Sequence, residues 1–217
     1  MKVGTDGVLV GAWASVRPSD RRILDIGTGT GLIALMMAQR APGAWITGID
    51  IEDLTEARAN AASSPWGGRI DFGQCRVQDF RPAEGFDLVV SNPPFFVGSL
   101  LCPDVGRTHA RHAVSLPFAE LRDAVVRLLR PAGRFAVVLP ADEAGRFIDL
   151  CRPVLQLVRR TDVRTTPRRP VKRVLMEFCA ASDPVVPLVD SLVVGTGEHE
   201  TYTSEYQALT RDFYLKF

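Results

Sequence analysis

Short apolar runs alternate with segments of helical spacing along the first half of the chain. The apolar runs end at turn residues and predict buried strands, which we expect at Arg22–Ile26, Ala44–Ile49, Ile70–Gln78 and Phe86–Val90. The segments between them predict helices at Thr30–Arg40 and Glu52–Ala62. Pro42, just beyond the basic Arg40, is a typical stop signal for the first of these helices.

The second half continues the same pattern. Leu116–Leu129 is amphipathic, with its apolar residues on one face, and predicts a helix. A turn at Pro131-Ala132-Gly133 leads to an expected strand at Arg134–Leu139, and Glu143–Leu150 predicts a further helix. Near the end of the chain, Leu188–Val194 is a strand candidate. Glu205–Phe213 follows as a helix candidate, with Ser204 and Gln207 at capping-box spacing.

Two more strand candidates, Val154–Val158 and Val174–Cys179, have no helix between them. Parallel neighbours need a long crossover, so this pair favours an antiparallel hairpin at one sheet edge. The alternation elsewhere predicts helices on both faces of a parallel sheet. We therefore expect an α/β, doubly wound, Rossmann-like sheet that is mainly parallel, with an antiparallel edge hairpin. Residues 1–217 would form a single domain.

Composition narrows the class further. The 217 residues are 46% hydrophobic with a net charge of +1, which suits a globular protein and not a general polyanion binder. We find no membrane span and no leader peptide, and so expect a cytoplasmic protein. The cysteines lack CxxC spacing and a histidine cluster, so we expect neither a disulfide framework nor a metal site. They are Cys75, Cys102, Cys151 and Cys179.

A glycine-rich turn follows the first strand. Gly27, Gly29 and Gly31 come directly after Asp25-Ile26, with the spacing GxGxG and not the GxGxxG of dinucleotide enzymes. Glycines there let the backbone approach a ligand closely, at the strand end where open α/β sheets bind ligands. S-adenosylmethionine fits this pattern because it needs no pyrophosphate cradle, but needs an acidic group near its methionine ammonium and another for its ribose hydroxyls. Asp25 would serve its methionine ammonium, through water or backbone.

Two more acids follow later strands. Asp50 ends the second strand and is placed to accept hydrogen bonds from the two ribose hydroxyls. Asp79 follows the third strand and would accept from the adenine amino group. By itself Asp79 is equally typical of a turn residue.

The catalytic candidate is Asn92-Pro93-Pro94-Phe95, immediately after the fourth strand. An exocyclic amine is a poor nucleophile because its lone pair is delocalised. The Asn92 side-chain oxygen and the Pro93 carbonyl would hold the two amine hydrogens and turn that lone pair toward the methyl donor. Proline stiffens the loop and adds no competing N–H, and Phe95 would stack on a base. The reaction then depends mainly on proximity and orientation.

These motifs resemble class I amino methyltransferases. The opening MKVGTDGVLVGAWA, the segment SNPPFFVGSL, RTHARH and the tail ALTRDFYLKF resemble, more closely, the bacterial tRNA1(Val) (adenine-37-N6)-methyltransferase family. The resemblance implies N6 methylation of the adenine beside the anticodon, with tRNA as partner. Members of that family usually begin upstream of the position of Met1.

The resemblance also implies site roles. Thr5, Asp6 and Gly7, within a segment 1–14, would close over the methionine end of the cofactor. Residues 184–217 would form a C-terminal strand and helix extension. The glycine turn with Asp25 would line the cofactor, Asp50 the ribose and Asp79 the adenine. The string from Asn92 to Phe95 would carry out the chemistry, with Asn92 also contacting the cofactor.

A basic segment between the hairpin strands is the candidate RNA surface. Against one acid, Asp162, it contains Arg159, Arg160, Arg164, Arg168, Arg169, Lys172 and Arg173. The planar fork of arginine suits phosphate, and a base in an anticodon loop is already single-stranded. We expect this segment to form a loop close to Asn92. A solvated charged hairpin without a ligand is the plain alternative. For His109 and His112, loop packing and substrate contact stay open, whereas metal binding is disfavoured because it would need more ligands.

The residues alone leave other functions open. The same chemistry suits ribosomal RNA guanine N2 or protein glutamine N5, although the basic segment favours RNA. A non-catalytic module that binds cofactor and RNA is disfavoured by the intact Asn92–Phe95 string. A nicotinamide oxidoreductase is disfavoured by the glycine spacing. We expect a monomer.

Overall fold

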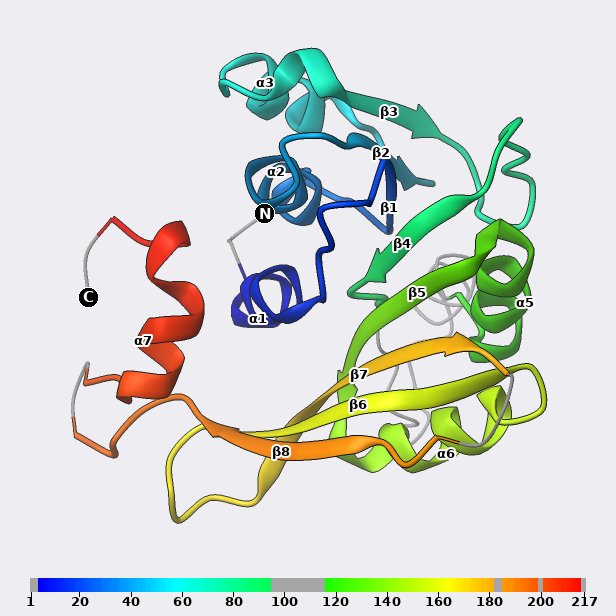
Figure 1. Cartoon of the computed structure of the whole chain (residues 1–217). Helices are drawn as coiled ribbons and strands as arrows, with labels where there is room; N and C mark the ends of the chain where they lie inside the picture. The colour runs from blue at the N-terminus through cyan, green and yellow to red at the C-terminus, as the bar shows by residue number, and fades with distance from the viewer. Residues whose placement is uncertain (1–3, 95–115, 182–184, 199–200, 216–217) are drawn as a thin grey trace, which may run out of the picture.

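The computed structural model describes residues 4–94, 116–181, 185–198 and 201–215. Eight strands form one sheet in the order β3-β2-β1-β4-β5-β7-β6-β8, with helices on both faces (Figure 1). The strands are β1 Arg22–Ile26, β2 Trp45–Asp50, β3 Ile70–Gln74, β4 Phe86–Ser91, β5 Leu129–Pro140, β6 Leu155–Arg164, β7 Val171–Ala180 and β8 Leu188–Val193. Strands β1 to β5 are mutually parallel, as predicted.

Helices α1 (Thr5–Trp13), α2 (Leu32–Arg40), α3 (Thr55–Ala62) and α7 (Ser204–Thr210) cover one face of the sheet. Helices α5 (Phe118–Leu128) and α6 (Ala141–Cys151) cover the other. Two short 3₁₀ turns, Gly67–Arg69 and Arg211–Phe213, are the remaining elements within the described ranges. Each face has its own apolar core, so the central strands are buried on both sides. None of the helices in the described ranges is long and apolar enough to cross a membrane.

The expected hairpin is present: β6 and β7 are antiparallel, and β7 pairs antiparallel with β5. Both strands are longer than predicted and include most of the basic segment, so the expectation of a basic loop was wrong. In β6 the charged Arg160, Asp162 and Arg164 alternate with the buried Thr161 and Val163, and this charge density hid the strand pattern. Strand β8, parallel to β6, is the outermost strand at this end.

Two local predictions also need correction. Strand β5 begins at Leu129 and includes the expected Pro131–Gly133 turn, with a register shift opposite Phe86 and Leu88. A Cβ on Gly133 would lie 2.8 Å from the Phe86 carbonyl oxygen, so glycine permits this close approach. Helix α7 is capped by Thr203, whose side chain accepts from the Tyr206 N–H, and not by the expected Ser204 box. Thr203 supplies its hydroxyl one residue earlier than predicted.

Candidate active site

The glycine turn lies between β1 and α2 at the carboxyl end of the sheet. Gly27, Gly29 and Gly31 have φ values of 74°, 53° and 81°, which favour glycine. A Cβ on Gly31 would lie 3.1 Å from the Phe72 ring, whereas a Cβ on Gly27 would meet no atom within 4 Å. Gly31 therefore lets α2 start tightly against β3, and Gly27 leaves open space beside its backbone.

Asp25 stabilises this turn from beneath. Its Oδ2 accepts from the Thr28 hydroxyl at 2.6 Å and from the Ala34 N–H at 3.2 Å. The carboxylate is fully buried and Oδ1 has no partner. Burial raises its pKa to about 7, against the opposing hydrogen bonds from Thr28 and Ala34. Asp25 lines neither of the cavities described below, so it fixes the turn and the start of α2.

Asp50, the last residue of β2, connects this strand to the glycine turn. Its Oδ2 accepts from the Gly29 N–H at 2.9 Å, and its Oδ1 accepts from the Glu52 N–H at 3.0 Å. The half-buried side chain also lines a cavity. A carboxylate has further lone pairs beyond these two bonds, so Asp50 can still accept from a ligand hydroxyl.

Asn92 lies directly after β4. The Ser91 hydroxyl donates to the Ile26 carbonyl at 2.8 Å and ties the ends of β4 and β1 together. Asn92 is half-buried, Pro93 is buried and Pro94 is exposed. Phe95, His109, His112 and Cys102 lie outside the described residues.

Two cavities meet at Asn92. The Asp50 cavity, of about 560 Å³, is lined by Asp50, Ile51, Val77, Gln78, Pro93, Pro94 and neighbouring residues. The Lys172 cavity, of about 530 Å³, is lined by Thr5, Gly7, Thr165, Lys172, Arg173 and neighbours. Asp6, Gly27, Thr30 and Asn92 line both. Each volume is typical of a small-molecule site, so two ligands can meet at the Asn92 side chain.

Helix α1 forms one wall of the site. Gly7 lies so close to Asn92 that an added Cβ would be 3.9 Å from the Asn92 amide nitrogen. Asp6 accepts from Arg173 Nε of β7 at 2.7 Å. The predicted closing residues Thr5, Asp6 and Gly7 therefore lie together beside the glycine turn and Asn92.

The basic residues are divided between three environments. Arg159 lies 4.2 Å over the Trp13 ring and donates to the Trp13 carbonyl, and Arg160 pairs with Asp162. Arg164 ends β6, and Arg168 and Arg169 are exposed in the turn that follows. Lys172 and Arg173 line the Lys172 cavity.

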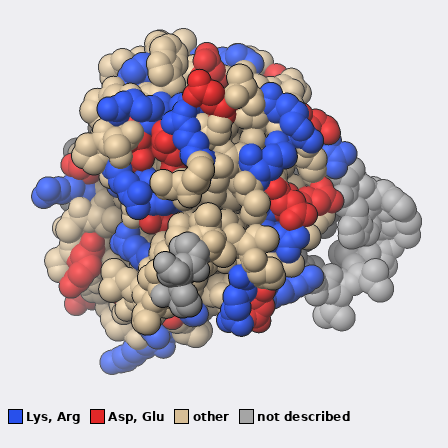
Figure 2. All heavy atoms as spheres, turned by 45° about the vertical axis from the view of Figure 1, so that its right-hand side comes forward, with Lys and Arg blue, Asp and Glu red and all other residues tan. Residues whose placement is uncertain are grey.

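Basic side chains on the face shown in Figure 2 are interspersed with acidic ones. Arg159 and Arg160 contact other residues of this chain, Trp13 and Asp162. The other basic residues lie on or beside the β6–β7 turn, at the carboxyl end of the parallel strands.

The third expected acid lies elsewhere. Asp79 is exposed and does not line the Asp50 cavity, whereas its neighbours Val77 and Gln78 do. Sequence reasoning missed Gln78 and extended the third strand as far as this residue, whereas β3 ends at Gln74 and Gln78 lies in the turn beyond. A polar residue directly after the buried Val77 was the usable signal. Among the described residues, no group of three or more His, Cys, Asp and Glu side chains is arranged to hold a metal ion.

Comparison with known proteins identifies relatives. Residues 8–142 match the model of the methyltransferase small domain family. A tRNA1(Val) (adenine(37)-N6)-methyltransferase of Phocaeicola vulgatus is 47% identical over 99% of this chain and 91% of its own length. Proteins of the same name from Bacteroides thetaiotaomicron and Musicola paradisiaca are 43% and 42% identical, over 99% of this chain and 91% and 88% of their own lengths.

Solved structures share the fold at low identity. A predicted O-methyltransferase from Agrobacterium tumefaciens has a TM-score of 0.71 at 17% identity, covering 95% of this chain and 96% of its own. The glycopeptide N-methyltransferase MtfA, complexed with S-adenosylmethionine, has a TM-score of 0.60 at 15% identity, covering 83% and 90%. The architecture is that of a class I methyltransferase.

Proposed function

This chain belongs to the methyltransferase small domain family and, within it, to the tRNA1(Val) (adenine(37)-N6)-methyltransferases, and we propose that it methylates N6 of adenine 37 in that tRNA. S-adenosylmethionine is the methyl donor. The observation that carries the proposal is the position of Asn92 at the junction of two cavities. A donor in one and a nucleotide in the other would meet at this amide.

The residues present fit the cofactor. The open space beside Gly27 lets a ligand approach the backbone of the turn closely, and Asp25 holds that turn from beneath. Asp50 would hold the ribose hydroxyls, and Thr5, Asp6 and Gly7 would enclose the methionine end with Gly27 and Gly29. When bound, S-adenosylmethionine supplies a methyl group on an electrophilic sulfonium centre.

The chain's own contribution is to orient the amine. The Asn92 side-chain oxygen and the Pro93 carbonyl accept the two N–H groups of the adenine N6. Held in this way, the nitrogen lone pair faces the cofactor side, and proximity and orientation supply most of the rate enhancement. After transfer, the nitrogen releases a proton to solvent. Phe95 is assigned to stacking on the base.

The basic residues complete the substrate side. Lys172 lines the cavity beside Asn92, and Arg164, Arg168 and Arg169 lie on or beside the same turn. They would bind phosphates of the anticodon stem-loop, while Arg159 and Arg160 serve mainly the internal contacts described above. One chain supplies both cavities, so we propose a monomer that acts on tRNA in the cytoplasm.

The decisive experiment uses labelled S-adenosylmethionine and unmodified tRNA1(Val) transcript, followed by nucleoside analysis. A second transcript with guanine at position 37 is the matched control. Label in N6-methyladenosine from the first transcript alone supports the proposal. Label in N2-methylguanosine, or equal labelling of both transcripts, contradicts it.

A further inference from the structure

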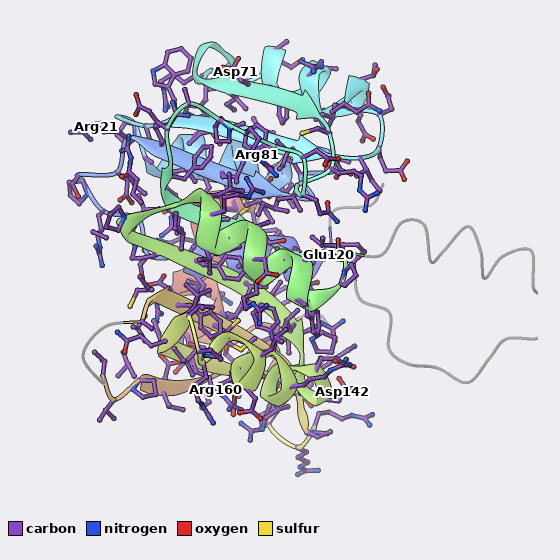
Figure 3. All side chains as sticks on the ribbon, turned by 90° about the vertical axis from the view of Figure 1, so that its right-hand side faces the viewer. Arg21, Asp71, Arg81, Glu120, Asp142 and Arg160 are labelled. Atoms are coloured by element: carbon purple, nitrogen blue, oxygen red, sulfur yellow. The ribbon has the colours of Figure 1, made fainter. Side chains whose placement is uncertain are left out.

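Helix α5 fixes one wall of the Asp50 cavity. Arg127, in its last turn, donates to the carbonyl oxygens of Val77 at 2.9 Å and Phe80 at 2.6 Å. Glu120, in its first turn, accepts from the side-chain amide of Gln78. Figure 3 shows Glu120 at the N-terminal end of this helix. Two side chains of α5 therefore hold the turn after β3. Arg127 binds its backbone carbonyls, and Glu120 binds the side chain of Gln78.

Gln78 is the side-chain amide that this turn presents to the cavity, next to Arg76 of the same turn. The exposed Asp79 does not line it. The lining combines apolar side chains with carboxylates. The apolar ones include Ile26, Ile49, Val77 and Leu116, and the carboxylates include Asp50, Glu52, Asp53 and Glu56. Such a wall suits a flat heterocycle next to a sugar, with one amide at the edge of the ring.

Glu120 determines which end of the Gln78 amide is left for a ligand. An amide offers both a donating NH₂ and an accepting oxygen, whereas a carboxylate only accepts. The NH₂ of Gln78 must therefore face Glu120. The oxygen, Oε1, stays available as an acceptor at the cavity wall. Without Glu120 the amide can rotate and present either end.

We propose that Gln78 Oε1 accepts a hydrogen bond from the exocyclic amino group of the cofactor's adenine, and that Glu120 is the positioning residue that fixes the amide for this role. The inference rests on the proposed function and deepens it. Adenine donates an N–H at this edge, and hypoxanthine places a carbonyl acceptor there. The Glu120–Gln78 pair then selects the adenine form, because hypoxanthine would leave two acceptors facing each other.

The test is calorimetric and needs no tRNA. S-adenosylhomocysteine and S-inosylhomocysteine differ only at the purine edge in question. The wild-type chain should bind the adenine form roughly tenfold or more tightly, since an unsatisfied polar group at a ligand site typically costs at least that factor. Glu120→Gln lets the amide rotate, and should bring the two affinities within about threefold by improving binding of the hypoxanthine form. Gln78→Ala should also remove the preference, by weakening the adenine form.

Matched controls separate this role from general loss of charge. Asp123→Asn removes a carboxylate from the same helix, at a side chain that is 66% exposed and paired with Arg122. Asp79→Asn changes the adjacent residue outside the cavity. Both should keep the wild-type preference. Gln78→Ala provides an independent measurement if Glu120→Gln fails to fold.

Two results overturn the inference: a wild-type chain with equal affinity for the two ligands, or a preference lost in Asp79→Asn and kept in Gln78→Ala. Neither depends on RNA. A chain that shows the expected preference yet leaves tRNA unmethylated would contradict the substrate assignment alone.

Discussion

Asp6 and Arg173 form an ion pair, with Arg173 Nε 2.7 Å from Asp6 Oδ2, that joins the first turn of α1 to the start of β7 beside Asn92. Both side chains are about one-quarter exposed, and both line the Lys172 cavity. The pair therefore connects the cofactor-closing segment to the substrate-side strand. Its position suggests a larger effect on catalysis than on stability.

Asp6→Asn tests this. We expect the free energy of unfolding to fall by less than about 1 kcal/mol, the usual range for a partly exposed pair. We expect kcat/KM for tRNA to fall by roughly tenfold, which corresponds to about 1.4 kcal/mol of transition-state stabilisation. Denaturant unfolding and steady-state kinetics measure the two effects.

The control for Asp6→Asn is Asp162→Asn. The Arg160–Asp162 pair has the same 2.7 Å separation and comparable exposure, but neither residue lines either of the two cavities that meet at Asn92. This variant should show the small stability loss with near-normal kinetics. Equal kinetic losses in both variants would mean that the Asp6–Arg173 pair has no special place in catalysis.

Replacement of Asn92 tests the orientation mechanism. Asn92→Ala removes one of the two acceptors for the target amine, and we expect kcat to fall by about 10²-fold or more, as for other preorganised hydrogen-bonding groups. The affinity for S-adenosylhomocysteine, measured by calorimetry, should stay within a few-fold. Near-normal turnover in Asn92→Ala would refute the assigned role.

Asn60 is the chain's only other asparagine, and serves as the control. Its amide donates to the Thr30 carbonyl next to the glycine turn. Asn60→Ala should therefore alter cofactor affinity more than turnover.

The exposed turn between β6 and β7 supplies a third prediction. Arg168→Ala combined with Arg169→Ala should weaken tRNA binding and flatten its salt dependence. Each lost phosphate contact reduces the slope of log K against log salt by roughly 0.7 to 0.9. Binding titrations over a range of salt concentrations measure the slope.

Arg146 and Arg152 on or beside α6 are equally exposed arginines, each near a carboxylate three residues away. Their double alanine variant should keep the wild-type slope. An unchanged slope in the Arg168/Arg169 variant would place the RNA elsewhere on the protein.

The sequence predicted those features that depend on local pattern. The bounds of β1 are as expected because a short apolar run between a basic residue and glycines has few alternatives. The glycine turn, Asp50 and Asn92 come together because carboxyl ends of neighbouring parallel strands share one edge of the sheet. Family resemblance extended this to Thr5, Asp6 and Gly7, whose place beside Asn92 no local pattern indicates.

Other features depend on tertiary packing. Helix α1 has no amphipathic pattern, because Gly7 to Trp13 are all buried between α2, α7 and the sheet. Arg159 looked like an RNA ligand, and its stacking on Trp13 follows from a contact between residues 146 positions apart. Asp79 and Gln78 are adjacent polar residues in a turn. Which of them lines the cavity is decided by the contacts of α5, which a linear pattern does not contain.

Asp25 supplies a prediction on pH. Burial raises its pKa from 3.8 to about 7 in the folded chain, despite hydrogen bonds from Thr28 and Ala34. The folded state therefore holds this proton more tightly than the unfolded state. The stabilisation from Asp25 is complete below pH about 4 and is lost as the pH rises through about 7. Asp25→Asn keeps an acceptor for Thr28 and Ala34 and removes the titration.

We therefore expect the melting temperature of Asp25→Asn to rise relative to that of wild type between about pH 5 and pH 7. Wild type loses the stabilisation from Asp25 as the pH approaches this pKa, whereas the variant has no carboxyl group to titrate there. Asp87 is the opposite case. Burial raises its pKa, but the hydrogen bonds from Arg21, Arg130 and Arg22 outweigh burial and lower it overall. Asp87→Asn should thus run parallel to wild type over that window and differ in slope only at acid pH, below the ordinary value of 3.8. Scanning calorimetry of the three proteins from acid to neutral pH measures both trends. If the Asp25→Asn and wild-type curves stay parallel up to neutral pH, the buried carboxylate is ionised throughout, and its charge must be balanced within the glycine turn.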